Sequence, residues 1–115
     1  MRKDDRIRVR HMLDAALEAM AFSKNKERGD LDKERMLVLS LVKSIEIVGE
    51  AASKVSQDTR DHYPEIPWAN IVGMRNRLIH VYFDIDLDRV WDTVTDDLPL
   101  LINALEKIVR QEETL

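Results

Sequence analysis

One short stretch, residues 73–86, combines side chains that could transfer protons with side chains that could bind phosphate, and it reads GMRNRLIHVYFDID. An unperturbed histidine has a pKa of about 6.5 and can give or take a proton near neutral pH. An arginine guanidinium is a permanent, bidentate ligand for phosphate. The candidate residues are Arg75, Asn76, Arg77, His80 and Tyr82. A packed histidine and a tyrosine at the edge of the core are the alternative explanation.

Helix geometry limits how these residues can act together in one chain. At about 100° per residue, Arg75 and His80 lie about 140° apart around a straight helix, whereas Asn76 and His80 share a face. Arg75 and His80 can therefore reach one small ligand only in certain arrangements. Either the helix is distorted near His80, or the ligand lies across the helix, or a two-fold partner brings a second copy of both residues.

Four stretches of the chain have apolar residues three or four positions apart, as the buried face of a helix requires. They predict helices over residues 4–24, 31–57, 68–82 and 84–110. The second would be roughly 40 Å long, which calls for an elongated bundle or a partner chain. Pro99 lies inside the fourth and predicts a kink there. We expect one all-α domain over residues 1–115, an antiparallel four-helix-type bundle with a short extra helical turn.

The second predicted helix has two features that bear on a site. Gly49 and its alanine neighbours form a patch of small residues, which predicts that another backbone packs closely against it. Glu46 and Glu50 are four residues apart and share a helical face. They either pair with Arg75 or Arg77 within the bundle or form a solvated rim.

The charge is unevenly distributed along the 115 residues. The net charge is −4, and the acidic surplus lies entirely in residues 83–115. The negative charge of the whole chain therefore does not argue against a nucleic-acid partner for residues 1–82. The chain has no cysteine, which excludes disulfides and thiolate metal sites. The alternating residues Asp84, Asp86 and Asp88 lack the glycine and glutamate of a calcium loop and are interpreted as helix caps. We expect no metal and no cofactor.

Apolar runs in this chain are too short for a membrane span, which needs roughly 18 consecutive apolar residues. The first residues are charged and no apolar run follows them, unlike a signal peptide. We therefore expect a soluble, cytoplasmic protein.

The spacing Arg75-x4-His80-x-Tyr82 resembles the motif of the HepT-like toxins, small helical ribonucleases of the HEPN superfamily. The likeness extends over nearly the whole chain, in the same order and spacing. It includes residues 45–52 (IEIVGEAA), Pro67-Trp68, residues 73–76 (GMRN) and residues 96–99 (DDLP).

The resemblance implies a metal-independent endoribonuclease that acts on cellular RNA, such as tRNA or mRNA. Arg75 and His80 would be catalytic, in a cleft between the two subunits of a HEPN-like homodimer. On this basis we hypothesise that dimerisation completes the site, that Asn76 orients His80, and that Arg77 reaches phosphate or a neighbouring carboxylate.

The resemblance also implies a partner, an MntA-like nucleotidyltransferase antitoxin that transfers AMP to Tyr82 and silences the toxin. Two rival interpretations remain. The chain could be a catalytically silent helical dimer that accompanies a nucleotidyltransferase subunit, or a structural four-helix dimer without a ligand.

Overall fold

The computed structural model describes residues 1–79 and 84–113, and these residues form helices and turns, with no strand. Three long helices make the frame: α1 (Lys3–Ser23), α2 (Arg35–Ser53) and α7 (Leu98–Glu113). Six shorter elements connect them: the 3-10 helix η1 (Arg28–Asp32), α3 (Gln57–His62), α4 (Trp68–Val72), α5 (Met74–Leu78), α6 (Leu87–Asp92) and the π-helical turn η3 (Thr93–Asp97). The all-α prediction is confirmed, and α3 is the predicted extra helical turn.

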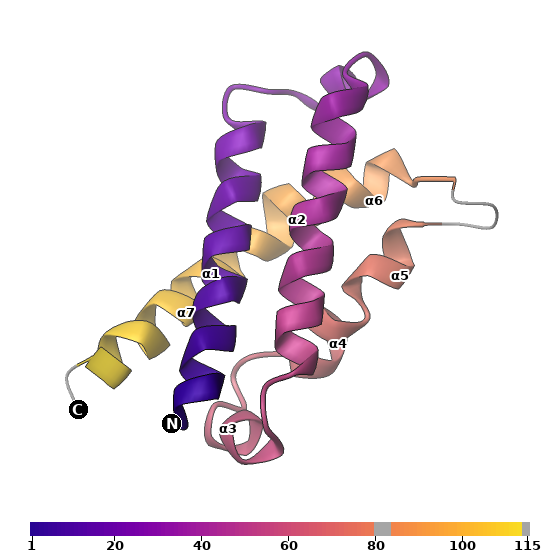
Figure 1. The fold of residues 1–115 in the computed structure, drawn as a ribbon. Helices are drawn as coiled ribbons and strands as arrows, with labels where there is room; N and C mark the ends of the chain where they lie inside the picture. The colour runs from indigo at the N-terminus through magenta and orange to yellow at the C-terminus, as the bar shows by residue number, and fades with distance from the viewer. Residues whose placement is uncertain (80–83, 114–115) are drawn as a thin grey trace.

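The helix α2 lies between α1 on one side and the pair α4–α5 on the other (Figure 1). Figure 1 shows α1 and α2 side by side, with α7 packed against α1 and the pair α4–α5 packed against α2. The molecule is elongated, with extents of 46 × 30 × 19 Å. Within the described residues, no helix is both long and apolar enough to cross a membrane.

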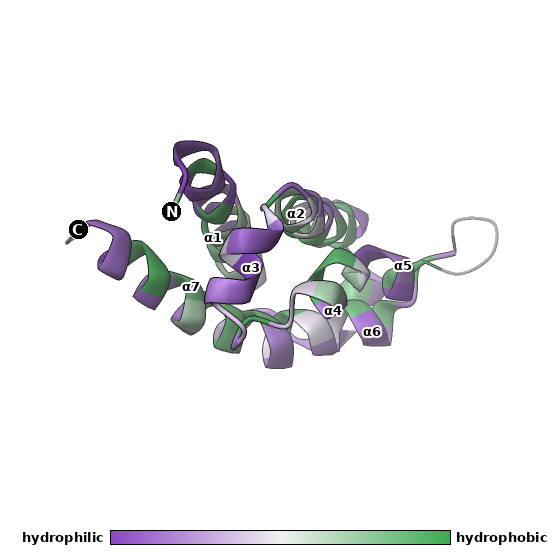
Figure 2. Cartoon of the chain, turned by 90° about the horizontal axis from the view of Figure 1, so that it is seen from below, coloured by the Kyte–Doolittle hydropathy of each residue, from purple (hydrophilic) through white to green (hydrophobic). Residues whose placement is uncertain are grey.

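The core lies where the apolar faces of these helices meet (Figure 2). Met12 of α1, Leu41 and Ile45 of α2, and Leu98 and Leu105 of α7 have no exposed surface. Burial of each such side chain stabilises the fold by roughly 1.5–3 kcal/mol relative to leaving it in water. These residues follow the three- and four-residue spacing that predicts the helices.

The second predicted helix, residues 31–57, is shorter than expected because both of its ends belong to other elements. Leu31 is buried within η1, where the backbone N–H of Glu27 donates to the Asp30 carboxylate at 2.7 Å. At the other end, Ser56 is the N-cap of α3. The 19 residues of α2 span about 28 Å at 1.5 Å per residue, so its length alone does not require a partner chain.

The third predicted helix, residues 68–82, is split into α4 and α5. The two meet at Gly73, a residue type that weakens a helix interior because it loses more conformational freedom on folding than any other. The helix α5 ends at Leu78, and Ile79 is extended, with φ −119° and ψ 123°. His80 and Tyr82 lie outside the described residues.

The fourth predicted helix, residues 84–110, starts at Leu87 with Asp86 as its N-cap, because the Asp86 side chain accepts a hydrogen bond from the Arg89 N–H at 3.0 Å. A kink was expected at Pro99, but the α-helix is already interrupted upstream by η3. Proline has no N–H to donate to the carbonyl four residues before it, and the wider π turn lies at that point. Both threonine hydroxyls of η3 donate to carbonyl oxygens four residues upstream, each at 2.8 Å.

Candidate active site

The pair α4–α5 is held against α2 by a close approach of backbones at Gly49. A Cβ atom added at Gly49 would lie 3.1 Å from the carbonyl oxygen of Ile71 and 3.5 Å from that of Val72. A distance of 3.1 Å is tighter than ordinary van der Waals contact. The predicted close packing at the small-residue patch is thus confirmed, and it brings the segment that carries Arg75 next to α2.

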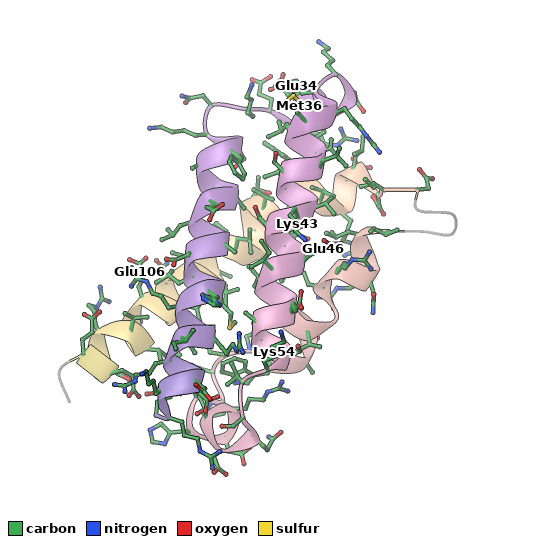
Figure 3. The ribbon with its side chains drawn as sticks, in the orientation of Figure 1. Glu34, Met36, Lys43, Glu46, Lys54 and Glu106 are labelled. Atoms are coloured by element: carbon green, nitrogen blue, oxygen red, sulfur yellow. The ribbon has the colours of Figure 1, made fainter. Side chains whose placement is uncertain are left out.

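Arg75 is oriented toward α2 through an ion pair with Glu46, whose Oε1 accepts a hydrogen bond from the Arg75 Nε. The Arg75 side chain is 45% exposed, whereas that of Glu46 is 25% exposed. Lys43, one turn earlier on α2, approaches the same carboxylate at 3.8 Å. Figure 3 shows Lys43 and Glu46 on the side of α2 that faces α5. Of the two alternatives for Glu46, the structure supports pairing with Arg75.

A cavity of about 420 Å³ lies beside this ion pair, between α2 and the α4–α5 segment. Arg75 and Asn76 line it from one side, and Glu46 and Glu50 line it from the other. Glu50 pairs with Lys54 on its own helix at 3.6 Å and not with an arginine of α5. The cavity therefore brings together two predicted site residues, Arg75 and Asn76.

Arg77 lies on the other side of α5. Its Nη2 donates to the carbonyl oxygen of Asn70 at 2.6 Å, and it lines a different cavity, of about 540 Å³, together with Arg89 of α6. Within the described residues, Arg77 thus does not converge with Arg75. Two positions along a helix correspond to about 200° of rotation, so Arg75 and Arg77 are presented to different surfaces.

The residues that flank His80 and Tyr82 are described, although these two are not. Ile79 and Ile85 form an isolated antiparallel bridge, and the Asp86 N–H donates to the Leu78 carbonyl at 2.7 Å. The end of α5 and the start of α6 are therefore adjacent. Because α5 ends at Leu78, the face-by-face geometry of one straight helix does not apply to Arg75 and His80.

A second polar cluster joins α1 to the segment that follows α2, and the sequence pattern does not predict it. Asp5 of α1 is buried and accepts hydrogen bonds from the Ser56 N–H and from the hydroxyls of Ser56 and Thr59, at 2.9, 2.6 and 2.7 Å. Nearby, the Tyr63 hydroxyl donates to Glu112 of α7 at 2.6 Å. These contacts join residues about 50 positions apart, a distance over which helical periodicity carries no signal.

Asp5 and Tyr63 have shifted pKa values. Burial by itself would raise the pKa of Asp5, but the hydrogen bonds from Ser56 and Thr59 and the charge of Arg2 outweigh it, and the pKa is lowered. Burial, followed by the hydrogen bond to Glu112, raises the pKa of Tyr63 to about 12. The part of the chain that the structure describes contains no group of three or more histidine, aspartate or glutamate side chains that could hold a metal ion.

The fold and the Arg75 cavity define a small helical-bundle protein with an accessible arginine site, and comparison with known proteins identifies its family. The family model Ribonuclease HepT-like matches residues 12–108, and the chain belongs to this family. No solved structure matches the chain significantly.

Several relatives with related names match most of the chain. A Methanocaldococcus jannaschii protein that is an RNase by name is 36% identical over 92 residues, which cover 80% of this chain and 76% of the relative. A second protein of the same organism, also an RNase by name, is 33% identical and covers 83% and 87% of the two chains. A Thermococcus cleftensis protein named as a ribonuclease HepT is 39% identical over 69 residues, 60% of this chain and 63% of the relative.

Proposed function

We propose that this chain is an endoribonuclease that cleaves RNA without a metal ion, with Arg75 and His80 as its catalytic residues. Membership of the HepT-like family and the names of the relatives support the activity. The observation that carries the proposal is that the Arg75 side chain is 45% exposed beside a cavity of about 420 Å³, where a phosphate can reach it.

The chemistry needs few groups because RNA contains its own nucleophile. The 2′-hydroxyl attacks the adjacent phosphorus, the P–O5′ bond breaks, and the product ends carry a cyclic phosphate and a 5′-hydroxyl. A base must accept the 2′-hydroxyl proton, an acid must protonate the 5′ oxygen, and a cation must stabilise the charge on the phosphorane. Histidine suits either proton transfer near neutral pH, and Arg75 supplies the positive charge. Asn76, which lines the same cavity, orients His80.

The proposal includes a homodimer, because one chain supplies one His80 and a two-fold pair supplies two. Val72, which lines the cavity, is 39% exposed, and Ile47, next to Glu46 on α2, is 38% exposed. Met36 and Leu39, earlier on α2, are 83% and 48% exposed. A second copy that covers these exposed apolar side chains of α2 and α4 would bring two Arg75 cavities together, and Arg77 would then contact phosphates farther along the RNA.

We infer in addition that the chain is the toxin of a toxin–antitoxin system in the cytoplasm, where it is silenced by a cognate MntA-like nucleotidyltransferase. Transfer of AMP to the Tyr82 hydroxyl releases pyrophosphate from ATP and leaves a phosphodiester two positions from His80. Its bulk and negative charge would occupy the place of the substrate phosphate. Intact-mass measurement after co-expression with the neighbouring nucleotidyltransferase should show adenylate increments that Tyr82→Phe lacks, and an unmodified mass would contradict this regulation.

The ribonuclease activity is tested with purified chain, labelled RNA and a chelator. Cleavage should persist in the chelator and should fall by about 10²–10³-fold in Arg75→Ala, as for loss of one group that stabilises transition-state charge. His80→Ala should be at least as deficient. Arg110→Ala, which removes an exposed arginine of α7, is the matched control and should cleave like the wild type.

Two results would contradict the proposal. If the wild-type dimer, verified by light scattering, does not cleave RNA but binds the nucleotidyltransferase, the silent-partner alternative is correct. If both Arg75→Ala and His80→Ala cleave normally while folding is unchanged, the catalytic residues are wrong.

A further inference from the structure

Glu46 is the residue that fixes the Arg75 guanidinium, and neither the proposed chemistry nor the Arg75-x4-His80-x-Tyr82 motif gives it a role. The hydrogen bond uses the Arg75 Nε, which lies along the side edge of the guanidinium group. Within residues 1–79 and 84–113, no partner is present for Nη1 or Nη2. The ion pair therefore leaves the outer edge of the guanidinium, with its parallel N–H groups, available for a phosphate.

The two partners of this ion pair differ in how firmly their own elements hold them. Glu46 lies in the middle of α2, a 19-residue helix, between the core residue Ile45, which has no exposed surface, and Ile47. Arg75 lies on α5, which has five residues and follows Gly73. Helices this short have little stability of their own. The carboxylate is thus the fixed partner, and the guanidinium takes its orientation from it.

The neighbouring charges indicate that Glu46 orients Arg75 and does not compete with the RNA phosphate for it. A carboxylate bound across Nη1 and Nη2 would occupy the place of a phosphate, but Glu46 contacts Nε. Lys43, at 3.8 Å from Glu46, offsets part of the negative charge that Glu46 brings to the cavity. Glu50 lines the same cavity but pairs with Lys54 at 3.6 Å. Glu46 alone among these side chains contacts Arg75.

We propose that Glu46 is the positioning residue of the site: it holds Arg75 by Nε so that the Nη1 and Nη2 edge faces the RNA phosphate. This inference depends on the proposed ribonuclease function. It predicts that loss of the carboxylate affects the rate of the chemical step more than substrate binding, because a misaligned charge still attracts RNA but no longer matches the transition state. A misplacement of about 1 Å can cost on the order of 10²-fold in rate.

The test compares Glu46→Ala, Glu46→Gln and Glu34→Gln. Glutamine keeps an acceptor oxygen for the Arg75 Nε and should restore most of the activity that alanine loses. Glu34 is a matched control, since it is the N-cap of α2 and pairs with Lys26 at 2.9 Å, away from Glu46 (Figure 3). We expect kcat to fall by about 10–10²-fold in Glu46→Ala, with KM changed less than threefold, and both values to be unchanged in Glu34→Gln.

A second readout does not depend on catalysis. In the wild type and in Glu46→Gln, the ¹⁵Nε–H signal of Arg75 should exchange slowly with water, and in Glu46→Ala it should exchange faster. Binding is measured with a 2′-O-methyl RNA, in which the nucleophile is blocked. Binding of this RNA should weaken in Arg75→Ala and much less in Glu46→Ala.

The outcomes separate this inference from the ribonuclease proposal. If the wild type cleaves RNA and Arg75→Ala does not, but Glu46→Ala has the wild-type kcat or a higher one, Glu46 is not a positioning residue. An Arg75 Nε–H that exchanges equally fast in all variants also overturns the inference. If the wild type neither cleaves RNA nor binds the 2′-O-methyl RNA through Arg75, the proposed function fails and the role of Glu46 fails with it.

Discussion

Ionised side chains occupy two contrasting settings around the C-terminal half of α2. In the network that joins α1 to α3, the Asp5 carboxylate is 3% exposed and accepts three hydrogen bonds from Ser56 and Thr59. In the cavity between α2 and the α4–α5 segment, Arg75 is 45% exposed and uses one of its nitrogens in the pair with Glu46. The first group has a lowered pKa and its partners are all internal, so it stabilises the fold. The second has, among the described residues, no partner for its other two nitrogens, and they can bind a ligand.

This contrast shows that a perturbed pKa does not by itself mark the functional site of a small helical protein. Shifts of pKa accompany structural networks as well as active sites. Here the pKa values of Asp5 and Tyr63 are shifted, yet their hydrogen bonds connect α1, α3 and α7 to one another. The accessible cavity and the exposed guanidinium of Arg75 identify the candidate site instead. Substitutions in both regions test this division.

The largest effect on stability is expected for Asp5→Ala, in the buried hydrogen-bond network. Removal of the carboxylate leaves the Ser56 N–H and two hydroxyls without their acceptor, which should destabilise the fold by about 3 kcal/mol. Chemical denaturation measures the change, and Asp4→Ala, an exposed neighbour in the same turn, should stay within about 0.5 kcal/mol of the wild type. Cleavage by the folded variant should be unchanged. Equal denaturation midpoints for the two variants would contradict the structural role.

The pH dependence of this effect follows from the direction of the pKa shift. The folded-state pKa of Asp5 lies below its ordinary value of 3.8. Its contribution to stability is therefore fully present above pH 3.8 and is lost as the pH falls through the folded-state pKa. The stability difference between wild type and Asp5→Asn should shrink over that acidic range.

A smaller loss, about 1.5 kcal/mol, is expected for Tyr63→Phe, which removes the hydroxyl that donates to Glu112 at 2.6 Å. The pKa of Tyr63 is raised to about 12 from an ordinary value of 10. The contribution of the hydroxyl is therefore fully present below pH 10 and is lost as the pH rises toward 12. Denaturation curves of the two proteins should converge over that range, and a difference that stays constant up to pH 12 would argue against the shift.

The smallest effect on stability, a loss of about 1 kcal/mol, is expected for Gly49→Ala. This change should also reduce cleavage. Alanine favours the helix by about 1 kcal/mol over glycine, while its Cβ would lie 3.1 Å from the Ile71 carbonyl and push α4 away from α2. Because α5 follows α4, cleavage should fall more than the loss of stability explains. Gly29→Ala is the control, since a Cβ there meets open space. Wild-type cleavage by Gly49→Ala would show that the close approach does not position Arg75.

The sequence alone predicts those features that depend on neighbours along one helix. Apolar spacing identifies the α1, α2 and α7 faces, the absence of a side chain at Gly49 predicts a close backbone contact, and Asp86 is recognisable as a cap. The choice for Glu46 between an arginine partner and a solvated rim needs the packing of α5 against α2. Arg77 is assigned to the Arg75 site by proximity in sequence, but it is presented to the opposite side of α5.

Other features cannot be predicted from the sequence pattern because they depend on contacts between residues that are distant in sequence. The Asp5 network joins α1 to residues 56–59, and nothing in the pattern around Asp5 indicates a partner 51 positions away. The break at Gly73 depends on how α4 and α5 each pack against α2. For His80 and Tyr82, the sequence resemblance remains the basis of the assignment.

The π-helical turn η3 also determines the phase of the C-terminal helix. The buried residues Val90, Val94 and Leu98 follow one another in steps of four, whereas α7 continues through Leu101 and Leu105 in steps of three and four. Two successive steps of four would drift by about 80° around an ordinary α-helix, and the wider π turn absorbs this drift. A π turn is equivalent to one residue inserted into an α-helix. Deletion of one residue from η3 would convert it to an ordinary α-helical turn and keep the apolar face of α7 against α1. Insertion of one more residue would rotate that face by about 100°, so this segment tolerates a change of length in one direction only.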